Sequence, residues 1–365
     1  MLRRHFITGL LLSPFIARSG FSLAAAAPNP AQVLPLWPKQ PPGGGGPLGA
    51  MAFSAKGAQR NIAMPTLTVF KPLQPKGRAV LIAAGGGYTR IEMGKEAWPA
   101  AAWLSAQGYT AYVLSYRLPQ EGWKDGALVS LQDAQRALRI VRHRENNVSV
   151  LGFSAGGHLL GMAANRADFH AYQASDALDN LPATADRAAL IYPIITLEPP
   201  YTHTSTHKVL VGKGASLSAD TAWSVQSYVN PQSPPFFLVQ AEDDPVSDPH
   251  NTLIMAAACK QQHVPVEMHR YPSGGHGFGL GKPGTQTTEW PGHYLHWLTA
   301  QRGERLSQAR QQRLRTGPRT KNTALHVNHA KCRFAVSSLG SGAEIGQYNI
   351  FAAALVVCVP HGMRK

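Results

Sequence analysis

The sequence predicts an α/β protein built on one mostly parallel sheet, with helices on both of its faces. Short apolar runs such as Ala79–Ala84 alternate along the chain with longer segments of helical character such as Val129–Arg144. Strands that alternate with helices form βαβ units, in which neighbouring strands are parallel. Several of the apolar runs show no alternation, as expected for strands that are buried on both faces.

The first predicted elements lie between residues 66 and 144. Thr66–Phe70 is rich in β-forming residues and is followed by a turn with Pro and Gly. Ala79–Ala84 is continuously apolar and ends in three glycines. Glu96–Gln107 has helical composition, and Thr110–Tyr116 is again typical of a strand. In Val129–Arg144 the apolar side chains recur at helical spacing on one face.

The same alternation continues to about residue 301. Val148–Leu151 is predicted as a strand and Gly157–Asn165 as a helix. The remaining elements are, in order, the strand Ala188–Ile195, the strand Pro235–Gln240, the helix Thr252–Gln262, the strand Val264–Tyr271 and the helix His293–Gln301. We therefore expect a single domain over residues 60–301.

The segments outside this domain differ from it in composition. Residues 1–27 join a basic start to an apolar stretch too short to span a membrane, as in an export signal. Their start resembles a twin-arginine signal, although Leu2 stands where Ser or Thr is usual, so the general secretory route stays open. Residues 28–59, rich in Pro and Gly, are predicted as a lead-in, and residues 302–365 as a poorly ordered basic tail of unknown role. A periplasmic or secreted location follows.

The net charge of +15 is concentrated at the two ends of the chain. Residues 1–27 carry three Arg and no acid, and residues 301–365 carry eleven Lys or Arg against two Glu. The middle of the chain holds the remaining 21 bases and 18 acids, a balance of only +3. This distribution argues against a nucleic-acid partner. Three cysteines at unsuitable spacings exclude a disulfide framework and a zinc site.

The candidate nucleophile lies in Gly152-Phe153-Ser154-Ala155-Gly156, which matches G-x-S-x-G between a predicted strand and a predicted helix. In that motif the serine occupies a sharp turn, so the residues two before and two after it must lack bulk. Both are glycine here. The N–H of Ala155 would then face the position where an oxyanion forms.

A second glycine-rich turn, Gly85–Gly87, follows the apolar strand Ala79–Ala84. Glycines there allow backbone N–H groups, those of Gly86 and Gly87, to approach a substrate oxygen. With Ala155 they would form an oxyanion hole. A phosphate-binding loop is disfavoured, because no Gly-Lys-Ser/Thr follows.

Candidate acid and base residues follow the last two predicted strands. Asp243 and Asp244 come directly after Pro235–Gln240, with Asp248 as a weaker third candidate, and His276 lies in a glycine-rich loop after the next strand. The order Ser, Asp, His is that of α/β-hydrolases. In this arrangement the histidine would take the serine proton and return it to the leaving alcohol, while the aspartate fixes the imidazole tautomer.

From about residue 33 to residue 298 the chain resembles bacterial α/β-hydrolase esterases related to acetyl-xylan esterase and to lipase/esterases with an H-G-G-G oxyanion motif. The matching runs are Leu36-Trp37-Pro38, Gly85–Tyr88, Leu114–Pro119, Asp133–Ala137, Gly152–His158, Asp243–Val246 and Gly274–Leu280. The resemblance implies an α/β-hydrolase fold, hydrolysis of short acyl esters, often acetyl groups on plant polysaccharides, and no metal or organic cofactor. It favours Asp244 as the triad acid, because the family's catalytic residue precedes a Pro-Val pair. Ala84 departs from the pattern, since relatives carry His or Pro there.

We therefore expect an exported serine esterase that removes short acyl groups from carbohydrate esters through an acyl-enzyme. The alternatives are a general small-molecule carboxylesterase, a lipase-like or feruloyl-type esterase, or a non-catalytic binding protein, which the intact triad disfavours. A peptidase is disfavoured because no segment of propeller size precedes the domain. Tyr88 and Trp98 are candidate substrate-binding residues. His158 is expected to be structural, and His203 and His207 have no third ligand nearby for a metal. The sequence sets neither the acyl and alcohol specificity nor the oligomeric state.

Overall fold

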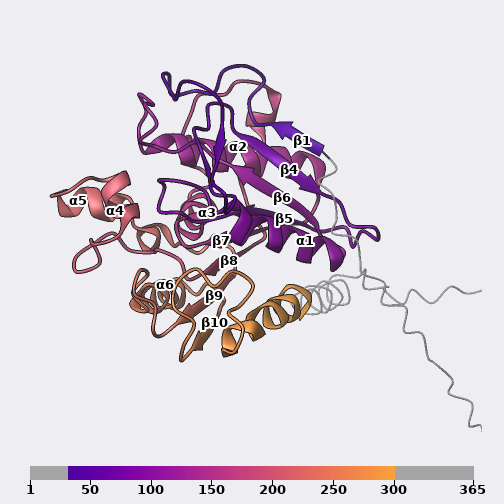
Figure 1. The fold of residues 1–365 in the computed structure, drawn as a ribbon, viewed down its shortest axis with the longest axis vertical. Coiled ribbons are helices and arrows are strands. Elements are labelled where there is room, and N and C mark those ends of the chain that lie inside the picture. The colour runs from indigo at the N-terminus through magenta and orange to yellow at the C-terminus, as the bar shows by residue number, and fades with distance from the viewer. Residues whose placement is uncertain (1–31, 301–365) are drawn as a thin grey trace, which may run out of the picture. The chain divides into compact units, whose positions relative to one another are not determined.

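The apolar runs assemble into one eight-stranded sheet (Figure 1). The computed structural model describes residues 32–300. The strands lie in the order β1-β4-β6-β5-β7-β8-β9-β10, and from β6 to β10 all neighbours are parallel. Their bounds are β1 (Gln32–Pro35), β4 (Thr66–Phe70), β5 (Ala79–Ala83), β6 (Thr110–Ser115), β7 (Val148–Phe153), β8 (Arg187–Ile191), β9 (Phe236–Ala241) and β10 (Val266–Tyr271). The predicted mostly parallel sheet is confirmed, with β1 and β4 antiparallel at one edge. A separate two-stranded sheet pairs β2 (Ala52–Phe53) with β3 (Gln59–Arg60).

The helices cover both faces of this sheet. Trp103 of α1 packs against Trp290 and Tyr294, so α1 and the helical residues 290–300 share one face. On the other face α2 packs on α3, and α3 and α6 both contact η3. The helices are η1 (Met93–Ala97, a π-helix), α1 (Trp98–Ala106), α2 (Leu128–Arg144), α3 (Ala155–Asn165), η2 (Ala177–Asn180), α4 (Ser205–Leu210), α5 (Leu217–Ala222), η3 (Val225–Tyr228), α6 (His250–Gln261) and η4 (Gln286–Glu289).

The register of the central strands places the predicted loops side by side. Ala83 at the end of β5 pairs with Gly152 of β7, and Phe153 pairs with Ile191 of β8. Strand β8 ends earlier than predicted, because Tyr192 has a φ of +38° and Pro193 cannot donate to a neighbouring strand. The residues that follow β5, β7 and β8 therefore meet at one edge of the sheet.

The lead-in predicted over residues 28–59 is wrong for its described part. Strand β1 pairs with β4, and both Leu36 and Trp37 are buried. They are held by α2: the indole of Trp37 donates to Asp133 at 2.9 Å, and Arg136 donates to the carbonyl of Leu36 at 2.8 Å. Composition gave no sign that Leu36 and Trp37 pack against α2, because the α2 side chains that bind them are polar.

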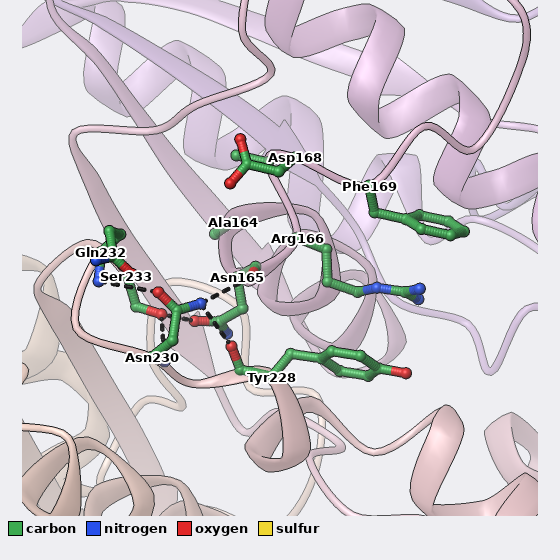
Figure 2. Close-up of a pocket in the computed structure, with 10 residues that line it drawn as sticks. Ala164, Asn165, Arg166, Asp168, Phe169, Tyr228, Asn230, Gln232 and Ser233 are labelled. Atoms are coloured by element: carbon green, nitrogen blue, oxygen red, sulfur yellow. Dashed lines mark hydrogen bonds between the residues drawn. The ribbon is translucent and has the colours of Figure 1, made fainter.

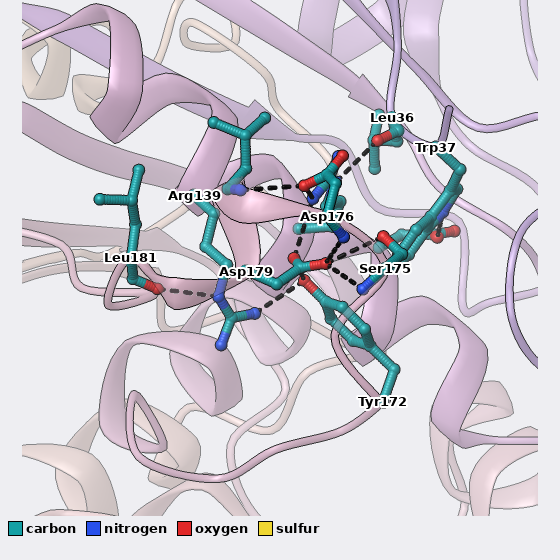
Figure 3. A network of polar contacts seen from close by, with 11 residues as sticks. Leu36, Trp37, Arg139, Tyr172, Ser175, Asp176, Asp179 and Leu181 are labelled. Carbon is teal, nitrogen blue, oxygen red and sulfur yellow. Dashed lines mark hydrogen bonds and ion pairs between the residues drawn. The ribbon is translucent and has the colours of Figure 1, made fainter. Parts of the chain in front are cut away.

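Those polar side chains form a buried network on α2 (Figure 3). Arg136 makes ion pairs with Asp176 at 2.6 Å and with Asp179 at 2.9 Å. Tyr172 donates to Asp179 at 2.6 Å, and Ser175 donates to the same carboxylate through its N–H and its hydroxyl. Burial alone would raise the pKa of Asp179, but these hydrogen bonds lower it to about 2. The α2 network thus ties the helix to the 172–181 loop.

A second buried ion pair joins the segment after β6 to α2. The guanidinium of Arg117 contacts both carboxylate oxygens of Asp133, at 2.8 to 3.1 Å, and neither side chain is exposed. Asp133 also accepts from the N–H of Arg117 and from Trp37. Three of the runs that carry the family resemblance therefore meet in one cluster, and their role is structural.

Two predictions concern residues outside the described part of the chain. The export signal over residues 1–27 and the basic tail over residues 302–365 stay predictions. Within residues 32–300, no helix is long and apolar enough to cross a membrane.

Candidate active site

Ser154 stands in the sharp turn that the G-x-S-x-G motif predicts. It caps the N-terminus of α3 directly after β7, with a φ of +50° that non-glycine residues rarely adopt. A Cβ on Gly152 would lie 2.5 Å from the carbonyl oxygen of Gly156, and one on Gly156 would lie 2.2 Å from that of Ala83. Only glycine fits at either position, so the strained turn depends on both.

The structure brings the three predicted triad residues into one hydrogen-bonded chain. The Oγ of Ser154 lies 2.8 Å from Nε2 of His276, and Nδ1 of His276 lies 2.8 Å from Oδ2 of Asp244. The Asp244 side chain is fully buried, whereas the imidazole is partly exposed. This is the order and direction of contacts that a general base needs to remove a serine proton.

The geometry separates the three candidate aspartates. The Oδ1 of Asp244 accepts from the N–H groups of Val246 and Ser247, which aims Oδ2 at the imidazole. Asp243 instead accepts from the N–H of Gly275 at 2.7 Å and so supports the histidine loop. Asp248 is bound to the side chain of His250 at the start of α6. Only Asp244 contacts His276.

The orientation of two peptides leaves the N–H groups of the predicted oxyanion donors Gly86 and Gly87 unengaged. The carbonyl of Gly85 accepts from the N–H of Glu92, and that of Gly86 accepts from the N–H and hydroxyl of Thr89. In a trans peptide the C=O and N–H point in opposite directions, so the N–H groups of Gly86 and Gly87 point away from these partners. Within residues 32–300, no acceptor engages either N–H. Ala155 is the first residue of α3, whose N–H has no acceptor inside the helix.

A cavity of about 190 Å³ opens beside these groups. Gly86, Gly87, Ser154 and His276 line it. The other lining residues are mostly polar or charged and are Arg90, Glu92, Lys95, Glu96, Ile194, Thr204, Ser205, Thr206, Val246 and Gly277. The cavity therefore presents the nucleophile and two of the predicted oxyanion donors to one small volume.

The two candidate substrate-binding aromatics do not line this cavity, so that prediction is wrong. Tyr88 is 1% exposed, and its hydroxyl lies 2.8 Å from Nδ1 of His158. Trp98 is 38% exposed but packs on Phe53, with ring centroids 5.9 Å apart. Tyr88 follows the glycine loop, but its backbone turns at a φ of +59° and directs the ring into the core.

His158 has the structural role predicted for it. Its Nε2 lies 2.7 Å from the carbonyl of Trp223, so the ring connects the oxyanion loop, through Tyr88, to the end of α5. Burial lowers the pKa of His158 to about 4. The ring is therefore neutral, with its proton on Nε2 and its Nδ1 accepting from Tyr88.

Sequence reasoning missed two residues at the site, Glu96 and Tyr192. The carboxylate of Glu96 accepts from the N–H of Gly85 at 2.6 Å and from the hydroxyl of Tyr192 at 3.0 Å. Tyr192 accepts in turn from the N–H of Gly279 at 3.0 Å, and its ring lies 5.1 Å from that of His276. Glu96 belongs to no chemical motif, and the one available signal was an acid directly before a helix of otherwise apolar residues.

A larger cavity of about 340 Å³ lies at the other end of α3 (Figure 2). It contains none of the triad residues. The side chains of Asn165 and Ser233 bond to each other, and Asn230 donates to the carbonyl of Asn165. The guanidinium of Arg166 lies between the rings of Phe169 and Tyr228, 3.8 and 4.3 Å from their centroids. Nothing in this cavity resembles a nucleophile with its base.

The histidines between β8 and β9 are not arranged to bind a metal. His207 pairs with Asp220 at 2.8 Å, and His203 lies 3.2 Å from the carbonyl oxygen of Val246. Among the described residues, no group of three or more His, Cys, Asp or Glu is placed to hold a metal ion.

Comparison with known proteins agrees with this geometry. A model of the prolyl oligopeptidase family matches residues 120–305, just over half of the chain. The chain belongs to the prolyl oligopeptidase family. The α/β-hydrolase fold expected from the sequence is confirmed. Within this family member, the matched residues include Ser154, Asp244 and His276.

Two named relatives are similar to part of the chain. It is 28% identical over 228 residues to an acetylxylan esterase from Xylanibacter ruminicola, an alignment that covers 59% of this chain and 44% of that protein. It is 30% identical over 215 residues to endo-1,4-beta-xylanase B from Butyrivibrio fibrisolvens, covering 55% of this chain and 32% of the other. The chain thus spans less than half the length of either relative.

A solved structure matches more completely. The acetyl ester-xyloside bifunctional hydrolase from Caldicellulosiruptor lactoaceticus is 28% identical, with a TM-score of 0.61 over 76% of this chain and 98% of that one. The resemblance to esterases related to acetyl-xylan esterase is confirmed.

Proposed function

We propose that this protein is a serine esterase that removes acetyl or other short acyl groups from carbohydrate esters through an acyl-enzyme. The observation that carries the proposal is the chain of 2.8 Å contacts from Ser154 through His276 to Asp244, beside a cavity edged by unengaged N–H groups. Ser154 attacks the ester carbonyl while His276 takes its proton, and Asp244 stabilises the resulting imidazolium.

The tetrahedral intermediate carries its negative charge on the former carbonyl oxygen. The N–H groups of Gly86, Gly87 and Ala155 stabilise that oxyanion, and each such donor contributes roughly 3–4 kcal/mol to lowering the barrier. His276 then gives its proton to the leaving alcohol, which departs and leaves the acyl group on Ser154. Water, activated by the same imidazole, attacks the acyl-enzyme and releases the acid.

The size and lining of the cavity favour a short acyl group on a polar alcohol. Its volume of about 190 Å³ is below the roughly 300–1,000 Å³ typical of pockets for drug-sized ligands. Among the described residues that line it there is no Phe, Tyr or Trp to stack on an aryl acid. This favours acetyl over feruloyl or long-chain substrates. The acetylxylan esterase and the acetyl ester-xyloside hydrolase among its relatives support a carbohydrate as the alcohol.

The experiment is hydrolysis of 4-nitrophenyl acetate and of acetylated xylan by the full chain and by Ser154→Ala. We expect the wild type to cleave both, and the variant to lose about 10⁴-fold or more in kcat. Equal, slow rates for the two proteins would contradict the catalytic assignment. Cleavage of the aryl acetate without xylan would favour a general carboxylesterase. Faster cleavage of a peptide 4-nitroanilide would favour the peptidase that the family's name suggests.

A further inference from the structure

We propose that Glu96 is a positioning residue that holds the oxyanion loop and the histidine loop in one arrangement. This rests on the proposed function of the site. Its carboxylate bridges two groups that belong to different loops: the N–H of Gly85, before the oxyanion donors, and the hydroxyl of Tyr192, after β8. Glu96 is itself almost fully buried at the edge of the cavity.

On one side Glu96 fixes the oxyanion loop. The N–H of Gly85 is bound by the Glu96 carboxylate at 2.6 Å, and the carbonyl of Gly85 is bound by the N–H of Glu92 at 3.0 Å. Glu96 of η1 and the N-cap residue Glu92 therefore bind the two polar groups of the Gly85 backbone. Since the second contact sets the plane of the Gly85–Gly86 peptide, the direction of the Gly86 N–H depends on η1 staying in place. A Cβ on Gly85 would lie 2.7 Å from that of Ser154, so this loop also packs directly on the nucleophile.

On the other side Glu96 fixes the histidine loop through Tyr192. The Tyr192 hydroxyl donates to Glu96 and accepts from the N–H of Gly279, three residues after His276. Its ring packs edge-on against His276 and Phe278, with centroids 5.1 and 4.4 Å away. A tyrosine hydroxyl has one proton to donate, and a carboxylate oxygen is the acceptor that receives it here.

The charge environment indicates that Glu96 is kept for activity and not for stability. Its titratable neighbours are Glu92, Tyr116, Tyr192 and His276, and among the described residues no Lys or Arg pairs with it. Burial raises the pKa of Glu96, because its bonds to Gly85 and Tyr192 and the nearby His276 only partly offset desolvation. A buried carboxylate without a cation destabilises the fold when it ionises. Residues of this kind persist at sites where they serve function.

The test compares Glu96→Gln, Glu96→Ala and Tyr192→Phe with the wild type. Gln keeps an acceptor for Gly85 but cannot accept the Tyr192 proton on its amide nitrogen, whereas Ala loses both contacts. We expect kcat for 4-nitrophenyl acetate to fall about tenfold in Glu96→Gln and about 100-fold in Glu96→Ala, the size of losing one oxyanion donor. Tyr192→Phe is expected to lose about tenfold. KM stays within about threefold, since the donors act mainly in the transition state.

Stability separates positioning from a merely structural role. The folded protein binds the Glu96 proton more tightly than the unfolded chain does, so ionisation of Glu96 lowers stability progressively as pH rises above the ordinary Glu pKa of about 4.3. We expect the Tm of Glu96→Gln relative to wild type to increase between pH 4.5 and pH 8 while its kcat stays reduced. A variant that loses Tm and kcat together at every pH would overturn the proposal.

The matched control is Tyr294→Phe, a buried tyrosine whose hydroxyl has no partner within the described residues. It is expected to keep wild-type kcat. Labelling of Ser154 by a fluorophosphonate, followed by intact mass, gives a readout independent of the ester chosen. If the wild type is labelled but cleaves no acyl ester, the proposed function fails. Slower labelling of the Glu96 variants then still supports positioning, and equal labelling of wild type and variants overturns it.

Discussion

Asp133 and Asp179 are buried against arginines, whereas Asp244 and Glu96 are buried against neutral donors and near one imidazole. Around α2, Asp133 and Asp179 each pair with an arginine, which is permanently charged and holds the helix in position. At the active site, neither Asp244 nor Glu96 pairs with a Lys or Arg among the described residues. The negative charge there is available to the imidazolium that the proposed esterase mechanism forms on His276.

The two regions therefore respond differently to the loss of one charge. In the α2 network, removal of a partner leaves an uncompensated ion inside the protein and destabilises the fold. At the site, loss of a carboxylate charge removes stabilisation of a transient cation while the folded state loses little. Substitutions that keep side-chain shape can test this difference directly.

The largest expected effect is on activity, in Asp244→Asn. The amide oxygen can still accept from Val246 and Ser247, so the local structure is preserved. Its NH₂ group faces Nδ1 of His276 and favours the wrong tautomer. We expect kcat to fall about 10⁴-fold, equivalent to about 5 kcal/mol, with Tm close to wild type. Steady-state kinetics and calorimetry on the same samples measure both.

Asp243→Ala is the neighbouring control. It removes one hydrogen bond to Gly275, worth about 1 kcal/mol, from an exposed position. Its kcat is expected to stay within about tenfold of wild type. If Asp243→Ala were the more damaging of the two changes, the assignment of Asp244 to the triad would be wrong.

The next largest effect is on stability, in Arg117→Met. This change leaves Asp133 buried without its cation, and breaking such a pair typically costs about 3–5 kcal/mol. Denaturant unfolding measures the loss, and kcat per folded molecule stays unchanged because the pair lies outside the cavity. Adding Asp133→Leu removes the unpaired charge and recovers part of the loss. If Arg117→Met alone were as stable as wild type, the buried ion pairs around α2 would not stabilise the fold in the way that separates them from the active site.

The smallest effect is the pH dependence of Asp179→Asn. Hydrogen bonds outweigh burial and lower the Asp179 pKa to about 2, so its ionised form stabilises the fold. This contribution is complete above the unfolded pKa of about 3.9 and is lost as pH falls through about 2. We expect the variant to be less stable than wild type at pH 7, with the gap closing below pH 3. The Tm difference between variant and wild type therefore changes with pH in the opposite direction to that expected for Glu96→Gln. If both variants showed the same trend in Tm across pH, the comparison of the two regions would be wrong.

The sequence was sufficient to predict the strands and helices whose apolar residues are consecutive or helically spaced. It also identified Ser154 and His276, which the structure places 2.8 Å apart, because strained turns and glycine-rich loops leave local signatures. It did not decide between Asp243 and Asp244 from the residues themselves, since both follow β9 and only the fold shows which one faces the imidazole. The family pattern favoured Asp244, the residue whose carboxylate contacts His276 in the structure.

The features that sequence reasoning missed are long-range polar contacts. The docking of Trp37 onto Asp133 joins residues 96 positions apart, as does the bond between Glu96 and Tyr192. Asp133 and Glu96 are of residue types that are mostly solvent-exposed, so no local pattern marks them as buried. Polar residues acquire this role only when the sheet brings distant strands to the same edge.

The hydrogen bonds of His158 have one further consequence, which concerns the direction of hydrogen bonding near the oxyanion loop. This imidazole is uncharged down to about pH 4. Above that pH the Tyr88 hydroxyl therefore donates to His158, and His158 donates to the Trp223 carbonyl. Acidification from pH 8 to pH 5 does not reverse any bond in it. The hydrogen bonds that Tyr88 and His158 make next to the oxyanion glycines thus keep one direction over this range, and the pH response of the proposed esterase comes from other groups.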